Sequence, residues 1–227
     1  MSPPPLQAAI LDLDGTLVDT LGDFVVALNA TLADLGLTSV TRPFIAETIG
    51  QGSEHLLRTT LAAVGGDMAL YDAVWRLYQR HYEAINGEYA NVFDGVVEGL
   101  DWLARQGLPL ACLTNKPTAF ARTLLQRKGL DRCFGHVFGG DAFERRKPDP
   151  LPVLKACEAL GSPPRNTLMV GDSSNDARAA RAAGCPVLLV TYGYNHGRPV
   201  REVDADAFVD RLDALPRTGF AWPSHAP

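Results

Sequence analysis

The chain has 227 residues, 46% of them apolar and 21% charged, which is typical of a globular protein that buries a substantial core. Its 26 acidic residues exceed its 21 basic residues, and this net charge of −5 argues against a general nucleic-acid-binding protein. No apolar run reaches the roughly 18 residues that a membrane helix needs. Because residues 1–7 also lack a secretory signal pattern, we expect a cytoplasmic protein with no membrane partner.

The first expected element is a short apolar strand at residues 8–11. Residues 19–92 then indicate helices only, because apolar side chains recur at helical spacing within 21–35 and 70–85. Glycine-containing breaks separate these helical stretches. The insertion is acidic, and we expect this acidity to be a solvated helix surface.

Strands and helices alternate in the second half of the chain. Expected strands lie at residues 108–113, 136–138, 167–170 and 186–190, and helix-like stretches at 117–128, 149–160 and 176–183. This alternation is typical of a parallel sheet covered on both faces. The sequence therefore predicts an α/β fold with a doubly wound, Rossmann-like parallel-sheet core. We expect the core to comprise residues 1–18 and 93–227, and an all-helical cap domain to comprise residues 19–92.

Two acidic residues, Asp12 and Asp14, directly follow the first expected strand. Side chains two residues apart in extended chain point the same way, so these carboxylates should lie together. Two such carboxylates repel one another unless a cation or a proton lies between them. The following Gly15 allows the chain to turn sharply.

Three further polar segments follow expected strands, where α/β sheets place their ligands. One contains Thr114 and the amides of a helix start, which suit an anion. The next is a cationic loop that contains Lys147, and the last carries Asp172 and Asp176. Acidic oxygen ligands favour a hard divalent cation such as Mg²⁺, whereas a hydroxyl and a lysine suit phosphoryl oxygens. These residue types predict magnesium-assisted phosphoryl transfer, with one carboxylate as nucleophile and another as acid and base.

In this order and spacing, the four segments resemble the haloacid dehalogenase superfamily of phosphatases. That pattern is DxDGT, then Ser or Thr after the second strand, then a loop lysine, then GDxxxD. The resemblance implies that Asp12 attacks phosphorus to form an aspartyl-phosphate, and that Asp14 protonates the leaving alkoxide and later activates water. It also implies that Thr114 and Lys147 hold the transferring phosphoryl group. Asp14 favours phosphate substrates, because the dehalogenase branch lacks an acid there.

The same resemblance implies a Mg²⁺ cofactor. Its expected ligands are Asp12, the backbone carbonyl of Asp14, and Asp172, with Asp176 supporting the site through water or an indirect contact. Two structural alternatives stay open at this point. Thr114 is also a candidate helix N-cap, and Asp176 is also a candidate helix-start acid that stabilises the helix dipole.

Within the superfamily, residues 114–117, 170–185 and 191–197 resemble the bacterial phosphoglycolate phosphatase branch. This implies a small phosphorylated metabolite as partner, with hydrolysis of 2-phosphoglycolate to glycolate and phosphate as the expected reaction. One alternative is a phosphatase for a sugar phosphate or a nucleotide monophosphate. Others are a phosphomutase similar to β-phosphoglucomutase and a catalytically silent binding protein on the same fold.

The helical insertion contains one candidate anion receptor. Gly52 precedes a helix-like stretch at residues 54–64, whose free amides suit a substrate carboxylate, and Arg58 adds positive charge one to two turns on. An ordinary interhelical turn explains the same pattern. Beside Thr114, Asn115 is a further candidate phosphate contact, and Lys116 is expected either near the phosphate or at the surface.

The aromatic residues of the chain are expected to pack rather than to bind. Trp75, Tyr78 and Tyr82 fall at helical spacing, which favours a buried face. Tyr192 and Tyr194 follow the last expected strand, and we assign them no functional role.

Overall fold

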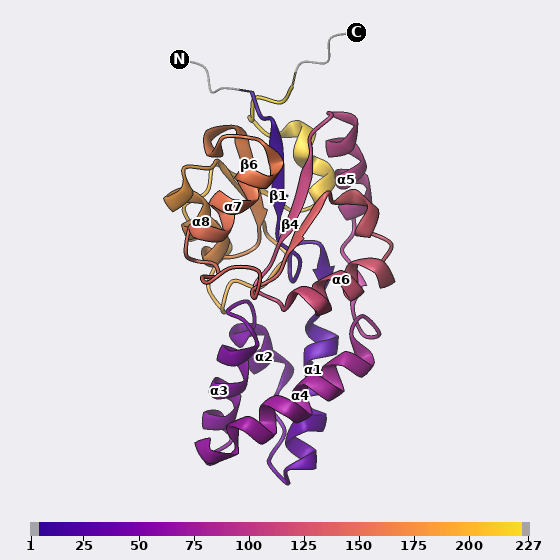
Figure 1. Cartoon of the computed structure of the whole chain (residues 1–227), viewed down its shortest axis with the longest axis vertical. Coiled ribbons are helices and arrows are strands. Elements are labelled where there is room, and N and C mark those ends of the chain that lie inside the picture. Colours follow the sequence, from indigo (N-terminus) through magenta and orange to yellow (C-terminus); the bar gives the residue numbers. More distant parts are fainter. Residues whose placement is uncertain (1–4, 224–227) are drawn as a thin grey trace.

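The computed structural model describes residues 5–223, so the outermost residues of the expected core, including most of the segment tested for a signal pattern, lie outside it. Its main feature is a six-stranded sheet with strand order β5-β4-β1-β6-β7-β8, in which every paired neighbour is parallel (Figure 1). The strands are β1 (Ala8–Leu11), β4 (Leu110–Leu113), β5 (His136–Phe138), β6 (Thr167–Gly171), β7 (Val187–Val190) and β8 (Ala207–Val209).

Helices cover both faces of this sheet, because its central strand is apolar on both sides. In β1, Ala9 and Leu11 belong to one buried cluster, whereas Ile10 belongs to another, as the alternation of a strand requires. The first cluster is covered by α5 and α6, the second by α7 and α8 (Figure 1). These helices are α5 (Val96–Arg105), α6 (Thr118–Arg127), α7 (Leu151–Leu160) and α8 (Ser174–Ala183). The doubly wound α/β fold predicted from the sequence is confirmed.

Four helices between β1 and α5 form what we call the helical segment. They are α1 (Leu21–Asp34), α2 (Arg42–Thr48), α3 (Ser53–Ala63) and α4 (Tyr71–Ile85). The chain enters and leaves this segment through a short antiparallel ribbon of β2 (Val18–Asp19) and β3 (Asn91–Val92). In Figure 1 the helical segment lies beyond the edge of the sheet at which β1 ends.

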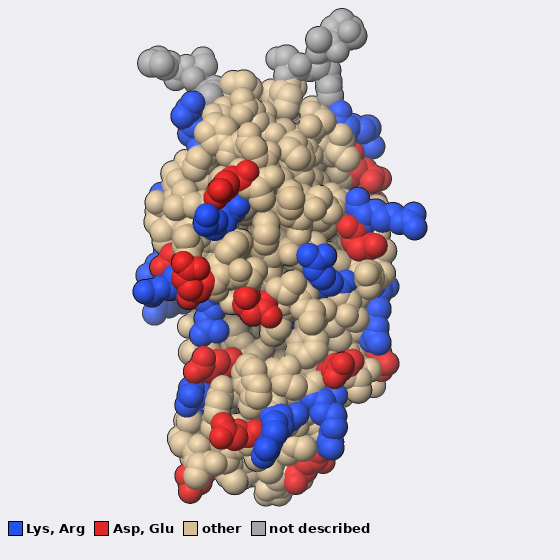
Figure 2. All heavy atoms as spheres, in the orientation of Figure 1, with Lys and Arg blue, Asp and Glu red and all other residues tan. Residues whose placement is uncertain are grey.

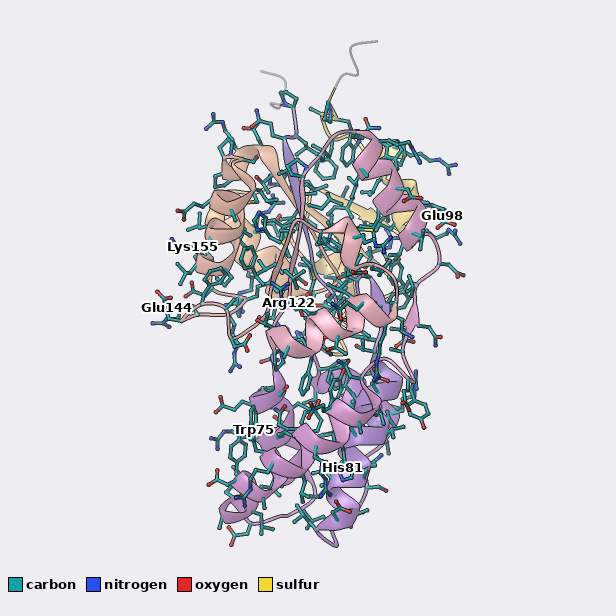
Figure 3. All side chains as sticks on the ribbon, turned by 45° about the vertical axis from the view of Figure 1, so that its right-hand side comes forward. Trp75, His81, Glu98, Arg122, Glu144 and Lys155 are labelled. Carbon is teal, nitrogen blue, oxygen red and sulfur yellow. The ribbon has the colours of Figure 1, made fainter. Side chains whose placement is uncertain are left out.

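The helical segment has an apolar cluster of its own. Tyr78 and Tyr82 of α4 are almost fully buried in it, and Trp75 packs against it, so the predicted packing of these aromatic residues is confirmed. On the surface, Asp34 of α1 accepts hydrogen bonds from Arg80 and contacts the His81 ring at 2.8 Å. Figure 3 shows Trp75 and His81 projecting from α4.

Charged residues of both signs are mixed on the face shown in Figure 2. On the face shown in Figure 2, Lys and Arg side chains lie among Asp and Glu rather than in a continuous basic area. Within residues 5–223, no helix combines the length and the apolar composition required to span a bilayer.

The two connections to the helical segment are tied together by Asp23, which lies fully buried in the first turn of α1. Its carboxylate accepts the backbone N–H groups of Gly87 at 2.6 Å and Tyr89 at 2.8 Å. Burial raises the pKa of Asp23, although these two hydrogen bonds oppose the change. A single side chain therefore supplies the acceptors for two amides that follow α4.

We expect Asp23→Ala to lower the free energy of unfolding by about 2–4 kcal/mol, because two amides lose their acceptor in a buried position. Urea unfolding monitored by circular dichroism measures this change. The matched control is Asp72→Ala, which removes an exposed acid from the first turn of α4 and should cost at most about 1 kcal/mol. Equal losses in the two variants would contradict this account of Asp23.

Candidate active site

The central strands β4, β1 and β6 are neighbours and parallel, so their carboxyl ends meet at one edge of the sheet. The residue that follows each strand is polar: Thr114 after β4, Asp12 after β1 and Asp172 after β6. Lys147 reaches the same edge from the loop between β5 and α7. The structure thus brings together residues from four segments that are up to 160 positions apart (172 minus 12).

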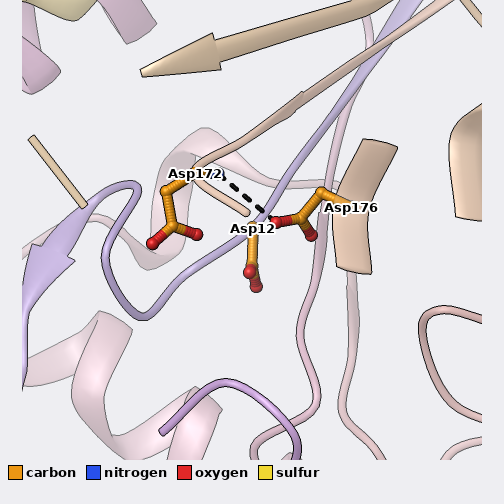
Figure 4. Close-up of side chains that lie close together, drawn as sticks. All are labelled: Asp12, Asp172 and Asp176. Atoms are coloured by element: carbon orange, nitrogen blue, oxygen red, sulfur yellow. Dashed lines mark hydrogen bonds between the residues drawn. The ribbon is translucent and has the colours of Figure 1, made fainter. Parts of the chain in front are cut away.

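Three carboxylates meet at this edge. One oxygen each from Asp12, Asp172 and Asp176 lies within 4.8 Å of the others (Figure 4). Burial raises the pKa of Asp12 to about 7, and the charge of Asp176 adds to this effect while Lys147 opposes it. Burial and the charges of Asp176 and Asp12 raise the pKa of Asp172 well above its usual range. The protein partners of the cluster therefore do not balance the charge of all three carboxylates in their ionised form.

Lys147 is the positive charge within the cluster. Its Nζ lies 2.9 Å from Oδ1 of Asp12 and 2.7 Å from Oδ1 of Asp176, and it donates to the carbonyl of Leu113 at 2.7 Å. Burial lowers the pKa of Lys147, but the charges of Asp12 and Asp176 outweigh burial, so the net change is upward. In return, Lys147 holds the pKa of Asp176 below its usual value despite burial.

Asp176 is the helix-start acid that the sequence analysis gave as an alternative, and it also pairs with Lys147. Its Oδ2 accepts the backbone N–H of Asp172 at 3.3 Å, and the N–H and hydroxyl of Ser173 at 3.2 and 2.7 Å. These bonds use an acid in the first turn of α8 to satisfy the amides at the start of that helix. Its other oxygen accepts a hydrogen bond from Lys147, so the Asp176 side chain both caps the N-terminus of α8 and holds the Lys147 ammonium in place.

The side chain of Asp172 lies against Gly15 and Gly193, where any larger residue would overlap with it. A Cβ added at Gly15, whose φ is +81°, would lie 2.1 Å from Oδ2 of Asp172, and one added at Gly193 would lie 2.3 Å from its Cβ. Oδ1 of Asp172 accepts the Thr16 hydroxyl at 3.3 Å, and Oδ2 accepts the backbone N–H of Tyr194 at 2.5 Å. The loop after β7 therefore contributes to the acidic cluster.

This contribution of the loop after β7 was not predicted from the sequence. Besides the Tyr194 amide, the hydroxyl of Tyr192 donates to the carbonyl of Thr16 at 2.8 Å. Tyr194 also bonds the carboxylate of Asp19 through its hydroxyl. The available signal was a glycine between two tyrosines directly after a strand, at the edge where the other polar segments lie.

Thr114 does not act as a helix N-cap, because α6 begins four residues later, with Pro117 at the N-cap position. The Thr114 hydroxyl instead accepts the backbone N–H of Lys116 at 3.2 Å. The side chain of Asn115 donates to the carbonyl of Lys147 at 2.8 Å and to that of Gly50 at 3.0 Å. In this arrangement, Asn115 joins this edge of the sheet to the helical segment.

A small cavity of about 30 Å³ lies between the sheet edge and the helical segment. Asp12, Asp14, Thr114 and Asn115 line it, and so does Gly52 at the N-terminus of α3. The other lining residues are Phe24, Ile49, Gly50, Ser53, Leu56, Tyr78, Tyr82, Lys116, Pro117 and Phe120.

The two basic residues considered from the sequence near this cavity, Arg58 and Lys116, lie in different places. Arg58 does not line it: its Nε donates to Glu54 at 3.0 Å, and its guanidinium lies 4.1 Å above the ring of Tyr71 on a half-exposed side chain. Arg58 is therefore not among the side chains that this cavity presents to a substrate. Lys116, whose location the sequence left undecided, is buried and lines the cavity beside Asp14.

Comparisons with known proteins give the family to which the chain is similar. The family model described as haloacid dehalogenase-like hydrolase matches residues 9–190. The chain is 44% identical over 213 residues to a phosphoglycolate phosphatase of Thiobacillus denitrificans, covering 92% of this chain and 94% of that protein. It is 38% identical over 210 residues to a phosphoglycolate phosphatase of Pseudomonas syringae, covering 91% and 77%.

The fold also matches a solved structure. A crystal structure described as a predicted phosphoglycolate phosphatase from Haemophilus somnus superimposes with a TM-score of 0.89 at 30% identity. The match covers 93% of this chain and 97% of that one.

Proposed function

Because the chain belongs to the haloacid dehalogenase-like hydrolase family, we propose that it is a phosphatase that forms an aspartyl-phosphate on Asp12. The main support for this proposal is the hydrogen bonding of the Asp12 carboxylate, whose two oxygens differ in their partners. Oδ1 accepts the backbone N–H of Leu13 at 2.7 Å and pairs with Lys147, whereas Oδ2 has no hydrogen bond within residues 5–223. A buried carboxylate fixed through one oxygen has the other available as a nucleophile.

The proposed first step is attack by an Asp12 oxygen on phosphorus. The bond from phosphorus to the leaving alkoxide oxygen breaks, and Asp14 donates a proton to that oxygen. In the second step Asp14 takes a proton from a water molecule that attacks the same phosphorus, which releases phosphate and restores the Asp12 carboxylate. The Thr114 hydroxyl and the Lys147 ammonium hold the transferring phosphoryl group.

We propose Mg²⁺ as the cofactor, held by Asp12, Asp172 and the backbone carbonyl of Asp14, with Asp176 supporting the site indirectly. The oxygen-only donor set suits a hard divalent cation. The raised pKa values of Asp12 and Asp172 indicate negative charge that a cation would stabilise. Such an ion would offset the repulsion between Asp12 and the phosphoryl oxygens.

The proposed substrate is 2-phosphoglycolate, a small metabolite. Relatives named phosphoglycolate phosphatase reach 44% identity over more than nine-tenths of both chains, and the cavity beside Asp12 is small. We propose that residues 19–92 act as a cap domain over a core of residues 1–18 and 93–227. The proposed phosphoryl contacts Thr114 and Lys147 are the same for every ester, so discrimination between esters requires other groups of the cavity wall, and the cap supplies many of these. Cytoplasmic location stays a prediction.

Phosphate release with Mg²⁺ tests the proposed function, using 2-phosphoglycolate beside sugar phosphates, nucleotide monophosphates and p-nitrophenyl phosphate. We expect kcat/KM for 2-phosphoglycolate to lead by about 100-fold, or roughly 2.7 kcal/mol of transition-state discrimination. A leading sugar phosphate or nucleotide would overturn the substrate assignment. Rearranged phosphate ester without free phosphate would indicate a mutase, and no turnover of any ester would indicate a silent binding protein.

The metal assignment predicts a large effect of a small substitution. In Gly193→Ala the added Cβ would lie 2.4 Å from Oδ2 of Asp172, so the carboxylate has to move. We expect Mg²⁺ affinity to fall about 10–100-fold. The rise in Tm on titration with Mg²⁺ measures this affinity without relying on turnover.

The control for this prediction is Gly219→Ala, because the space around Gly219 is open and its φ is not positive. Its Mg²⁺ affinity should equal that of the unchanged protein. A Gly193→Ala protein that binds Mg²⁺ normally would contradict the proposed role of Asp172 as a ligand.

A further inference from the structure

Lys116 lies in a position where a lysine is costly to place. It follows Thr114 and Asn115 in the loop between β4 and α6, and only 5% of its surface is exposed. Its Nζ is 4.7 Å from the ring centroids of both Phe24 and Tyr82. A charged ammonium in such surroundings requires close polar partners, because its desolvation is unfavourable.

The partners of Lys116 come from both parts of the chain. Its Nζ donates to the two carboxylate oxygens of Asp14 at 3.0 and 3.2 Å, and to the hydroxyl of Tyr82 at 2.6 Å. Asp14 is the acid that would protonate the leaving group, and Tyr82 belongs to α4 of the helical segment. Lys116 thus holds the acid of the proposed reaction at the wall of the cavity.

Lys116 is the one cationic side chain among the residues that line this cavity within the described chain. The helical segment contributes apolar side chains, glycines, tyrosines and Ser53 to the wall. Two arginines nearby, Arg58 and Arg146, each lie within ion-pair distance of Glu54 and are absent from the lining. A leaving group that carries its own negative charge therefore meets one positive side chain here.

We propose that Lys116 binds an anionic group of the leaving alcohol and thereby selects phosphate monoesters that carry a carboxylate beside the reacting bond. This inference rests on the proposed function and names the residue that recognises the carboxylate of the substrate. In 2-phosphoglycolate one methylene group separates the carboxylate from the bridging oxygen. Since Lys116 lies 3.0 Å from Asp14, which protonates that oxygen, the carboxylate falls within its reach.

A neighbouring element can share this contact. The first turn of α3 begins at Ser53, and Gly52 and Ser53 both line the cavity. Amides at the start of an eleven-residue helix lack intrahelical partners and attract anions. The carboxylate would lie between these amides and the Lys116 ammonium, which then shares its charge between Asp14 and the substrate.

The test compares two substrates that differ only in this charge. 2-Hydroxyethyl phosphate replaces the carboxylate of 2-phosphoglycolate by an uncharged hydroxymethyl group. We expect the ratio of their kcat/KM values to fall about 10–100-fold in Lys116→Met, the loss typical of one hydrogen bond to a charged group. Lys116→Arg should keep most of the preference, and Arg58→Met should leave the ratio unchanged. If Lys116→Met fails to fold, Lys116→Gln answers the same question.

The outcomes separate this inference from the proposed function. If the unchanged protein prefers 2-phosphoglycolate and the neutral Lys116 variants keep that preference, the inference is wrong and the proposed function stands. If the unchanged protein shows no preference for the carboxylated ester, the inference and the substrate assignment are both wrong, whereas the proposed phosphatase chemistry stands as long as phosphate is released. A ratio that collapses in the neutral variants and survives in Lys116→Arg supports the inference over a purely structural role, which would slow both substrates alike.

Discussion

Asp12→Asn should reduce kcat for phosphate release by at least about 10⁴-fold, equivalent to about 5.5 kcal/mol of barrier. The carboxamide has the size of the carboxylate but lacks the nucleophilic oxygen that attacks phosphorus. The protein should still fold, because Lys147 keeps its 2.7 Å contact with Asp176 and because burial already disfavours the charge of Asp12. Phosphate release under saturating substrate, with a urea unfolding curve for the same sample, measures both effects.

The control for this prediction is the same change at an exposed position. Asp94→Asn alters a solvent-facing acid in the loop after β3 and should retain normal turnover. If Asp12→Asn keeps more than about one-hundredth of the activity, another group is the nucleophile, since a lost nucleophile removes far more than that.

Lys147→Met should produce the second large effect, because it acts on both stability and catalysis. Methionine fills a similar volume, but it leaves the buried carboxylates of Asp12 and Asp176 without their shared cation. Breaking a buried ion pair by removal of one partner costs about 3–5 kcal/mol. We therefore expect a loss of that size in the metal-free protein at neutral pH, and at least about a 10³-fold loss of kcat from missing phosphoryl stabilisation.

Two comparisons make this prediction specific. Lys155→Met removes an exposed lysine that pairs with Glu158 on α7, and it should cost less than about 1 kcal/mol. Mg²⁺ should recover part of the stability of Lys147→Met, since a cation at the acidic cluster replaces some of the missing positive charge. A Lys147→Met protein as stable as the control would mean that Lys147 does not balance the cluster.

Much of the acidic cluster could be predicted from the sequence, because Asp12 and Asp172 each directly follow a strand. Once β1, β4 and β6 are expected to be parallel, their next residues must meet at one edge, which places Asp12, Thr114 and Asp172 together. The presence of Lys147 in the site was predicted from the family motif that its loop resembles and not from the periodicity of the sequence. Its distances to two carboxylates depend on the loop after β5, which no local pattern specifies.

The contacts of Lys116 could not be predicted in this way. Its partners Asp14 and Tyr82 are 102 and 34 positions away, on separate parts of the chain. Whether a lysine beside Pro117 points to solvent or inward depends on how α4 packs against the sheet edge. The position of Arg58 outside the cavity could not be predicted for the same reason, because its side chain is directed by contacts with Glu54 and with Tyr71 of α4.

Some elements of the fold are too short to be predicted from the pattern of apolar residues in the sequence. The ribbon strands β2 and β3 have two residues each, and β8 has three, so none is long enough to show alternation. Helix α2 spans only seven residues, about two turns, and its start is defined by the Thr41 side chain accepting the N–H of Phe44. Such short elements are stabilised by their tertiary contacts more than by their own residue pattern.

The most direct test of the account is to look for the phosphoryl group on the protein. A single turnover of 2-phosphoglycolate in the presence of Mg²⁺ is stopped with acid, and the digested protein is analysed by mass spectrometry. The account predicts one phosphoryl group on the peptide that contains Asp12, carried by Asp12 itself and absent from Asp12→Asn. Phosphate release from this sample with no modified peptide, or with the phosphoryl group on another residue, would contradict the assignment of Asp12 as the nucleophile.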